Sequence, residues 1–298
     1  MRSTVSPSDL DTALEQVRRE ISSALAGTIL DRLNFDLAEF LGAGKMLRAR
    51  AVVRMAMSMG HPLEPAVRAA AAVEMVHGAS LLHDDVIDGG WVRRSRPTLW
   101  AVHGARIAIL VGDVLLGRAL GVLTAAGRPA WVDALAGAVA EVCQTETEQE
   151  LLLRGQTVGW EDVLRIARGK TGPLFGFAAL AGSGGEGPVA DAAREAGYLA
   201  GTVYQISDDW LDVGGDPQRA GKTLGTDQLR EKPTTASVAR ISRPEVATLV
   251  DKLLERSRGV LSEWPDALRG WDAFLSLDLE PAVAANLREA DAKKSVHA

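Results

Sequence analysis

The sequence predicts an all-α protein that forms a single domain, and three observations support this. The chain has 298 residues, of which 47% are hydrophobic and only 5% aromatic; residues such as Ala, Leu, Glu and Arg dominate and favour helix over sheet. Helical periodicity runs through most of the chain, whereas strand-like alternation is absent. Short connections containing Gly and Pro separate segments of helical length, and none resembles a flexible interdomain linker. We therefore expect one domain over residues 1–298.

Individual helices can be expected in chain order. The first covers residues 10–26, after Ser8 and Asp9 as a helix start. A long Ala-rich helix covers 66–85. The most apolar segment, 107–126, contains Asp113 and Arg118, which are costly at the centre of a bilayer, so we expect no membrane span. A helix over 174–181 and another from 190 to 212 follow, and residues from about 243 onward form packing helices.

The glycines of segment 182–187 match the spacing of a dinucleotide-binding loop. That fingerprint requires a preceding strand, whereas residues 174–181 are expected to be helical. We therefore interpret this segment as a connector between two helices.

Composition narrows the class of function. The formal net charge of -6 argues against binding of nucleic acid, which needs clustered positive charge. Cys143 is the only cysteine, so the chain has no intramolecular disulfide and fits a reducing compartment; we interpret this residue as a small buried hydrophobe. The N-terminus lacks the pattern of a secretory signal. We expect a cytoplasmic protein.

Two aspartate clusters close two of the expected helices. Asp84, Asp85 and Asp88 end the first, and Asp208, Asp209 and Asp212 end the second with the same spacing. Carboxylates at a helix C-terminus repel the helix dipole and each other unless a cation offsets them. A single such cluster is more often a solvated acidic turn. Two matched clusters within apolar helical sequence favour a site for Mg²⁺, which prefers carboxylates, water and phosphate oxygens.

Basic residues lie near the first cluster, as a phosphate ligand would require. Lys45 and Arg48 precede it, and Arg93 and Arg94 follow it. Arg can hold a diphosphate through two hydrogen bonds, and Lys acts as a compact point charge. Each pair alone would more often be ordinary surface charge, and Lys170, Lys222 and Lys232 are ambiguous singly.

These residues together resemble the trans-isoprenyl diphosphate synthase (polyprenyl synthetase) family over about residues 40–236. The first family motif, DDxxD with a later RR, is Asp84 to Asp88 followed by Arg93 and Arg94, and the second ends in Asp208, Asp209 and Asp212. Residues 43–49 (AGKMLRA) are similar to the family's GGKRLRP stretch, and Lys170-Thr171 to its KT pair. The late GKxxGxD and KxT elements are similar to 221–227 and 232–234, and Gly112-Asp113 is another family landmark.

The resemblance implies an antiparallel helical bundle around a deep central cavity, the isoprenoid synthase fold, and usually a homodimer. It also implies a Mg²⁺-dependent prenyltransferase that couples isopentenyl diphosphate to an allylic diphosphate head-to-tail through an allylic carbocation, with two or three ions that Mn²⁺ can replace. The catalytic residues implied are Asp84, Asp85, Asp88, Asp208, Asp209, Asp212, Lys170 and Lys232, and the implied metal ligands are Asp84, Asp88, Asp208 and Asp212.

The resemblance further divides the basic and polar residues between two substrates. Those implied to bind the diphosphate of isopentenyl diphosphate are Lys45, Arg48, His77 and Arg94. Those implied on the allylic side are Arg93, Lys170, Thr171, Gln205, Lys222 and Lys232. His77 lies two helical turns before Asp84 on the same face, although without the family a structural histidine would be the better interpretation.

Product length depends on the helix before the first cluster. Ala79 and Ser80 lie about one turn before Asp84, where a growing chain would pass. Bulky aromatic residues at these positions resemble short-chain enzymes, so the small side chains here favour a product longer than farnesyl diphosphate. Alternatively, Ala79 merely permits close helix packing.

Several positions differ from the family pattern: Ala43, Met46, Ala49, Ser95 and the Gly89-Gly90-Trp91 loop. Because three of them flank the implied isopentenyl diphosphate site, an irregular coupling of two allylic substrates remains an alternative. A terpene cyclase of the same fold and a non-catalytic subunit of a heteromeric synthase are two others. The fully aspartate second motif argues against the cyclase, and the retained Lys and Arg residues argue against the subunit.

Overall fold

The expected all-α architecture is confirmed in a computed structural model of the chain, which describes residues 7–33, 35–215, 223–238 and 243–290. Apart from one short hairpin, the regular elements of these residues are helical. The helices are α1 (Pro7–Leu25), η1 (Ile29–Arg32), α2 (Leu37–Gly42), α3 (Leu47–Met59), α4 (Leu63–Asp88), α5 (Leu99–His103), α6 (Ala105–Thr124), α7 (Pro129–Glu148), η2 (Gln149–Leu153), α8 (Trp160–Gly182), α9 (Pro188–Gly214), α11 (Thr226–Leu229), α12 (Thr235–Val238), α13 (Arg243–Gly259), α14 (Pro265–Phe274), η3 (Leu275–Leu279) and α15 (Glu280–Glu289).

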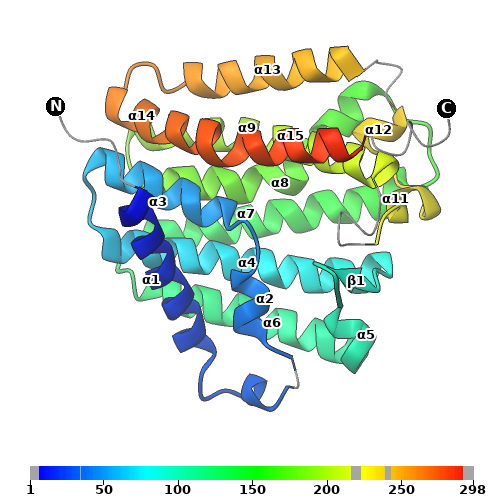
Figure 1. The fold of residues 1–298 in the computed structure, drawn as a ribbon, viewed down its shortest axis with the longest axis horizontal. Helices are drawn as coiled ribbons and strands as arrows, with labels where there is room; N and C mark the ends of the chain where they lie inside the picture. Colours follow the sequence, from blue (N-terminus) through cyan, green and yellow to red (C-terminus); the bar gives the residue numbers. More distant parts are fainter. Residues whose placement is uncertain (1–6, 34, 216–222, 239–242, 291–298) are drawn as a thin grey trace.

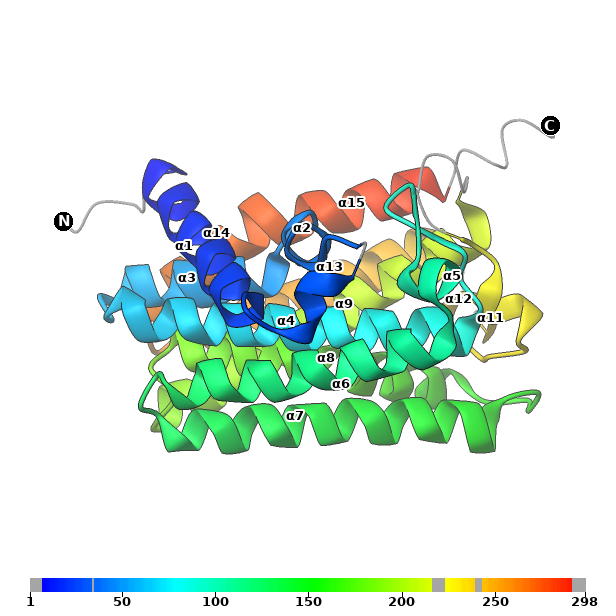
Figure 2. The same cartoon turned by 90° about the horizontal axis from the view of Figure 1, so that it is seen from below.

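The long helices α4, α6, α7, α8 and α9 lie side by side in an antiparallel bundle (Figures 1 and 2). Helices α4, α7 and α9 all end at the side of the molecule where α5, α11 and α12 lie, on the right in Figure 1. Both aspartate clusters are therefore carried to the same end of the bundle, because each closes a helix that runs in the same direction.

Helix α4 continues through its aspartate cluster and ends at Asp88, where Gly89 adopts a left-handed conformation with φ 67°. Its alanines are buried against the neighbouring helices α3, α6 and α8. Asp84 and Asp88 therefore lie on one face of a complete last turn. Helix α9 likewise runs to Gly214, beyond the second cluster. The glycine-rich segment between α8 and α9 connects two helices, which confirms its interpretation as a connector.

Glycines allow α8 and α9 to pack unusually closely. A Cβ atom at Gly201 would lie 2.7 Å from the Cα atom of Gly172, and one at Gly197 would lie 2.3 Å from the carbonyl oxygen of Phe175. Side chains at these positions would push the helices apart, since real Cβ contacts are longer. The close approach brings the polar residues of α8 next to the second aspartate cluster of α9.

Two surface features concern α6 and α7. Helix α6 is the one helix of the described chain long and apolar enough to cross a membrane, and 33% of its most apolar window is buried in the protein. Cys143 on α7 is exposed, so its interpretation as a buried hydrophobe is wrong. The reason is that α7 packs mainly on α8 and only lightly on α6, which leaves much of its surface uncovered.

A short hairpin follows α4 and was not expected from the sequence. Strands β1 (Val92–Arg93) and β2 (Arg96–Pro97) pair antiparallel. The two residues that join them, Arg94 and Ser95, have φ of 52° and 59°. Two consecutive left-handed residues form the tight turn that suits a two-residue hairpin, although side chains other than that of glycine make this conformation costly.

We therefore expect Ser95→Gly to raise the free energy of unfolding by about 0.5–1 kcal/mol, because glycine adopts a positive φ without steric cost. Chemical denaturation would measure the change. The matched control is Ser22→Gly in the last turn of α1, at an exposed position with helical backbone, which should instead destabilise by about 0.5–1 kcal/mol. A loss of stability in Ser95→Gly would contradict the strain assigned to this turn.

Candidate active site

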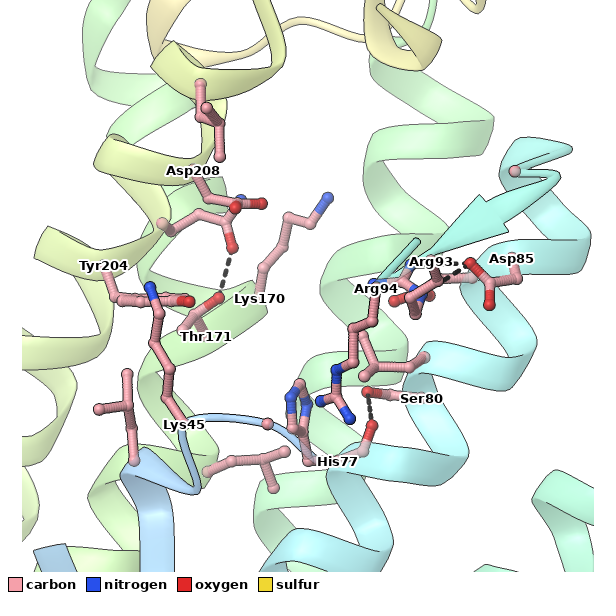
Figure 3. Close-up of a pocket in the computed structure, with 18 of the residues that line it drawn as sticks. Lys45, His77, Ser80, Asp85, Arg93, Arg94, Lys170, Thr171, Tyr204 and Asp208 are labelled. Atoms are coloured by element: carbon pink, nitrogen blue, oxygen red, sulfur yellow. Dashed lines mark hydrogen bonds and ion pairs between the residues drawn. The ribbon is translucent and has the colours of Figure 1, made fainter. Parts of the chain in front are cut away.

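A cavity of about 490 Å³ opens between the helix ends that carry the two aspartate clusters. Its walls come from α4, α7, α8, α9, the loop before α3 and the hairpin. Figure 3 shows Lys170, Thr171 and Asp208 on one wall and Asp85, Arg93 and Arg94 on the opposite one. The lining is therefore strongly charged, with acidic and basic side chains facing one another.

The three aspartates of the first cluster have different roles. All three of its carboxylates line the cavity. Asp85 is buried and accepts hydrogen bonds at Oδ1 from Arg93, with Nε and Nη2 both 2.8 Å away. This bond ties the hairpin to the end of α4. Asp84 and Asp88 lie one turn apart on α4, and both line the cavity.

The second cluster divides in the same way. Asp208 and Asp212 line the cavity, whereas Asp209 does not. Oδ2 of Asp209 accepts hydrogen bonds from the amide and hydroxyl of Thr235 at 2.9 and 2.8 Å, and Oδ1 accepts one from Gln205 at 2.8 Å. Asp209 thus holds α12 against α9, in the way that Asp85 holds the hairpin.

The pKa of Asp84 is raised to about 7, mainly by burial and then by the neighbouring carboxylate of Glu146, with Lys170 opposing the increase. The pKa of Asp209 is likewise raised to about 6, mainly by burial and then by the negative charge of Asp227. These carboxyl groups are crowded in a poorly solvated region. A cation in the cavity would relieve both effects, because it favours the ionised form of each carboxylate.

Lys170 on α8 is the central cation of this wall. Its Nζ atom lies 3.1 Å from Glu146 and donates a hydrogen bond of 3.0 Å to Gln149. Burial alone would lower the pKa of Lys170, but the surrounding carboxylates, Glu146 first among them, raise it above its ordinary value. Lys170 is therefore charged at neutral pH. The next residue, Thr171, donates a hydrogen bond to Gln205 of α9.

A second pair of cations reaches the first cluster from the segment after α9. Lys232 is buried, and its Nζ atom lies 2.7 Å from Asp88 and 3.6 Å from Glu150. Arg230 lies 3.7 Å from Asp88 and also pairs with Glu150. The π-turn η2 at the end of α7 presents Glu150 to both cations. Glu150 therefore holds Arg230 and Lys232 in place beside Asp88, where both cations could attract an anionic ligand.

A separate basic group lies deeper, beside the start of α3 and the middle of α4. Lys45, Arg48, His77 and Arg94 all line the cavity there, and Figure 3 shows Arg94 and His77 directed toward each other. The Arg48 guanidinium lies 4.8 Å from the ring centroid of Phe175. Burial, with the nearby guanidinium groups, holds the pKa of His77 well below its usual range, so the imidazole is neutral and can still donate one hydrogen bond.

Arg48 gives this group an unmet hydrogen-bonding requirement. The residue is 8% exposed, and within the described residues its buried Nε atom has no hydrogen-bond partner. Burial lowers the pKa of Arg48, because a low-dielectric surrounding disfavours a charge. A buried guanidinium N–H without an acceptor is costly. An anionic ligand in this part of the cavity would satisfy it.

The aspartates fit Mg²⁺ by the chemistry of their donors. Asp84, Asp88, Asp208 and Asp212 offer hard carboxylate oxygens to one cavity. No group of three or more His, Cys, Asp or Glu side chains among the described residues is close enough together to hold an ion by itself. Mg²⁺ is commonly bound by one or two carboxylates with water and substrate phosphates completing its shell. The arrangement fits an ion shared with a phosphate ligand.

The structure brings together most of the residues singled out from the sequence. The exceptions are Ala79, which is fully buried, Asp209, and Lys232; none of the three lines the cavity, although Lys232 contacts Asp88, which does. Ser80 does line it. Lys222 lies outside the described residues.

Several charged residues at the site were not identified from the sequence. They are Glu74, Glu146, Glu150 and Arg230, and Asp227, which closes the 221–227 element, was given no role in the site. Glu74 could have been identified from the sequence, since it is a lone carboxylate in an apolar helix, one turn before His77. The others lie in sequence of mixed polarity, and only the fold brings them to the cavity.

Known proteins share this sequence pattern and fold. Residues 36–267 match the polyprenyl synthetase family. A geranylgeranyl diphosphate synthase from Mycobacterium tuberculosis is 37% identical over 252 residues, which are 80% of this chain and 71% of that protein. An octaprenyl diphosphate synthase from Escherichia coli is 30% identical over 264 residues, covering 83% and 81% of the two chains. The crystal structure of a polyprenyl synthase from Caulobacter crescentus superposes with a TM-score of 0.78 at 23% identity, over 97% of this chain and 100% of that one.

Proposed function

The chain belongs to the polyprenyl synthetase family, and from this premise we propose that it is a Mg²⁺-dependent prenyltransferase that makes polyprenyl diphosphates. Its substrates would be isopentenyl diphosphate and an allylic diphosphate, joined head-to-tail. The observation that carries the proposal is one cavity lined by both aspartate clusters and by two sets of basic residues, Arg93 and Lys170 in one and Lys45, Arg48, His77 and Arg94 in the other. Two diphosphates, one of them bound with metal, fit this division.

The allylic diphosphate belongs at the aspartate end of the cavity. Asp84, Asp88, Asp208 and Asp212 would hold the Mg²⁺ ions between them and the diphosphate. Among the cations, Lys170 and Lys232 lie within ion-pair distance of carboxylates at this end, and Arg93 approaches from the hairpin. Thr171 and Gln205 would add polar contacts. We propose that Lys222 also binds the allylic diphosphate.

Isopentenyl diphosphate belongs at the deeper basic group of Lys45, Arg48, His77 and Arg94. The buried Nε atom of Arg48 supports an anion here, and neutral His77 can donate a hydrogen bond to it without adding charge. In this proposal the diphosphate at this group would be bound by the protein cations and the His77 imidazole, without a metal ligand.

The chemistry follows from these two placements. When bound, Mg²⁺ supplies Lewis-acid stabilisation of the departing diphosphate. Lys170, Lys232 and Arg93 stabilise the same negative charge as the allylic carbon-oxygen bond breaks. The double bond of isopentenyl diphosphate, held by the second group, then attacks the allylic cation, and a proton is lost to the released diphosphate. Apolar side chains such as Leu81, Val142 and Leu174 line the cavity and exclude water that would quench the cation.

Product masses test the proposal directly. The purified protein is incubated with Mg²⁺, isopentenyl diphosphate and, separately, dimethylallyl, geranyl, farnesyl or geranylgeranyl diphosphate. We expect products that grow by whole isoprene units. Consumption of an allylic diphosphate without incorporation of isopentenyl diphosphate would instead identify a cyclase or an irregular coupling, and no consumption would favour a non-catalytic subunit.

We propose that the products are longer than farnesyl diphosphate, since Ser80 leaves the cavity wall below Asp84 open. Ser80→Phe is therefore expected to shorten the main product by at least one isoprene unit, because the ring would occupy space that the chain requires. Ala79→Phe is the control: Ala79 is fully buried outside the cavity, so this change should lower stability by about 1–3 kcal/mol through overpacking. Mass spectrometry of products and thermal unfolding separate the two outcomes.

We also propose that the protein is a homodimer in the cytoplasm. Ile107, Ile109 and Leu110 are exposed on α6, and adjacent exposed apolar residues are typical of protein contacts. Light scattering of the purified protein should give twice the mass of one chain. A monomer that remains active would rule out the dimer as a requirement.

A further inference from the structure

Glu74 is a buried carboxylate to which the mechanism above assigns no role. It lies on α4, one turn before His77, and is 4% exposed. Its Oε1 atom accepts a hydrogen bond of 2.9 Å from the backbone amide of Ala49. Burial raises the pKa of Glu74, while Arg48 and the amide of Ala49 oppose the increase. A carboxylate in such a place needs compensating partners, and these all belong to one part of the site.

The hydrogen bond from Ala49 supplies what the start of α3 lacks. Helix α3 begins at Leu47, and its N-cap residue, Met46, makes no capping hydrogen bond through its side chain. An N-cap side chain ordinarily accepts from the second or third amide of the helix. Ala49 is the third residue of α3, so Glu74 provides this acceptor from a different helix. Its negative charge also favours the helix N-terminus.

The segment held in this way is the one that carries Lys45 and Arg48. Met46 between them has φ 48°, a left-handed conformation that is costly for a residue with a side chain. A Cβ atom at Gly44 would lie 2.5 Å from Nη2 of Arg94, so this loop and the hairpin are in close contact. A small movement of the start of α3 would therefore displace Lys45 and Arg48, and it would disturb Arg94 through the contact with Gly44.

The charge of Glu74 also suits the basic group. Arg48 and Arg94 both lower the pKa of Glu74, so the carboxylate faces two guanidinium groups. Together with Lys45 these carry three positive charges against one negative charge, and His77 is neutral. The group keeps a net positive charge for a diphosphate, while the carboxylate reduces repulsion between the cations when no ligand is bound.

We infer that Glu74 is a positioning residue for the isopentenyl diphosphate subsite. By accepting the hydrogen bond from Ala49 it fixes the start of α3, and thereby Lys45 and Arg48, without contacting the allylic diphosphate. The inference rests on the proposed function for the identity of the ligand. It predicts that loss of the Glu74 acceptor weakens the binding of isopentenyl diphosphate and leaves the binding of the allylic diphosphate unchanged.

Two variants of Glu74 separate the hydrogen bond from side-chain volume. Glu74→Gln retains an amide oxygen that can accept from Ala49, whereas Glu74→Met fills similar space without an acceptor. We expect Glu74→Met to raise KM for isopentenyl diphosphate about tenfold or more, with KM for the allylic diphosphate changed less than about twofold. Glu74→Gln should stay within about threefold of the wild type for both substrates. The control is Glu64 on the same helix, an exposed partner of Arg68, whose Gln and Met variants should change neither KM.

A binding measurement makes the test independent of turnover. Isothermal titration of isopentenyl diphosphate in the presence of EDTA measures its affinity directly. We expect the wild type and Glu74→Gln to bind isopentenyl diphosphate more tightly than Glu74→Met does. Equal weakening in the two Glu74 variants, or equal rises of both KM values, would overturn the inference. If Glu74→Met does not fold, a tenfold loss of affinity in Glu74→Gln still overturns the inference. If the wild type makes no product, the proposed function fails, while titration still tests the role of Glu74.

Discussion

Asp84→Ala and Asp208→Ala are each expected to reduce kcat by about 10³-fold or more, because each removes a ligand of the ions that stabilise the departing diphosphate. The two carboxylates come from different helices but line the same cavity. Steady-state assays at saturating Mg²⁺ measure the effect. Asp133→Ala on the exposed side of α7 is the control and should keep full activity. Normal turnover in both site variants would overturn the metal assignment.

The loss should not come from unfolding, and the pKa of Asp84 shows why. Burial raises this pKa to about 7, above the ordinary aspartate value in the unfolded chain. Between these values the folded protein binds more protons, so its free energy of unfolding falls as pH rises from about 4 to about 7. Asp84→Asn removes this decrease. Without metal, the variant should unfold at a higher temperature than the wild type at pH 8 and show a smaller difference at pH 5, as measured by calorimetry.

Lys170→Met is expected to reduce kcat by about 10²- to 10³-fold, since it removes a preorganised cation from the point where negative charge develops. Lys170 is held by Glu146 at 3.1 Å and by Gln149 at 3.0 Å, so its ammonium group needs little reorganisation. Removal also leaves Glu146 facing Asp84 without a cation between them. Because the uncompensated carboxylates attract a cation more strongly, we expect a lower Mg²⁺ concentration to be needed for half-maximal rate.

Lys252→Met provides the matched control for Lys170→Met. Lys252 lies exposed on α13, and its loss should leave both kcat and the metal dependence unchanged. Lys170→Arg should recover part of the rate, because the charge is retained although the longer fork changes its position. An unchanged kcat in Lys170→Met would remove Lys170 from the site as proposed.

The sequence predicted the helices that carry the chemistry because their signals are local. The apolar pattern of 66–85 and the repeated spacing of Asp84, Asp88, Asp208 and Asp212 lie within single helices. Helix ends were less predictable: α4 extends to Asp88 because Gly89 adopts a left-handed conformation beyond it. The hairpin was missed because two-residue strands carry no periodic pattern.

Contacts between segments that are distant in the chain could not be predicted from local sequence patterns. Asp85 and Asp209 look equivalent to their neighbours in sequence, yet one binds Arg93 and the other binds Thr235. Cys143 was misassigned because its exposure depends on how lightly α6 covers α7. Arg230 and Glu150 are 80 positions apart, and their pairing beside Asp88 follows from the course of the chain after α9.

The sequence by itself determined the fold class, the family and the residue types that bring acidic and basic groups to one end of a helical bundle. These depend on short-range periodicity and on motifs whose members lie a few residues apart. The tertiary structure alone decided which carboxylates face the cavity and which hold neighbouring segments, and that Glu74 caps α3 from α4. Such roles depend on close packing between helices far apart in the chain, where distances of a few ångströms decide each hydrogen bond and ion pair.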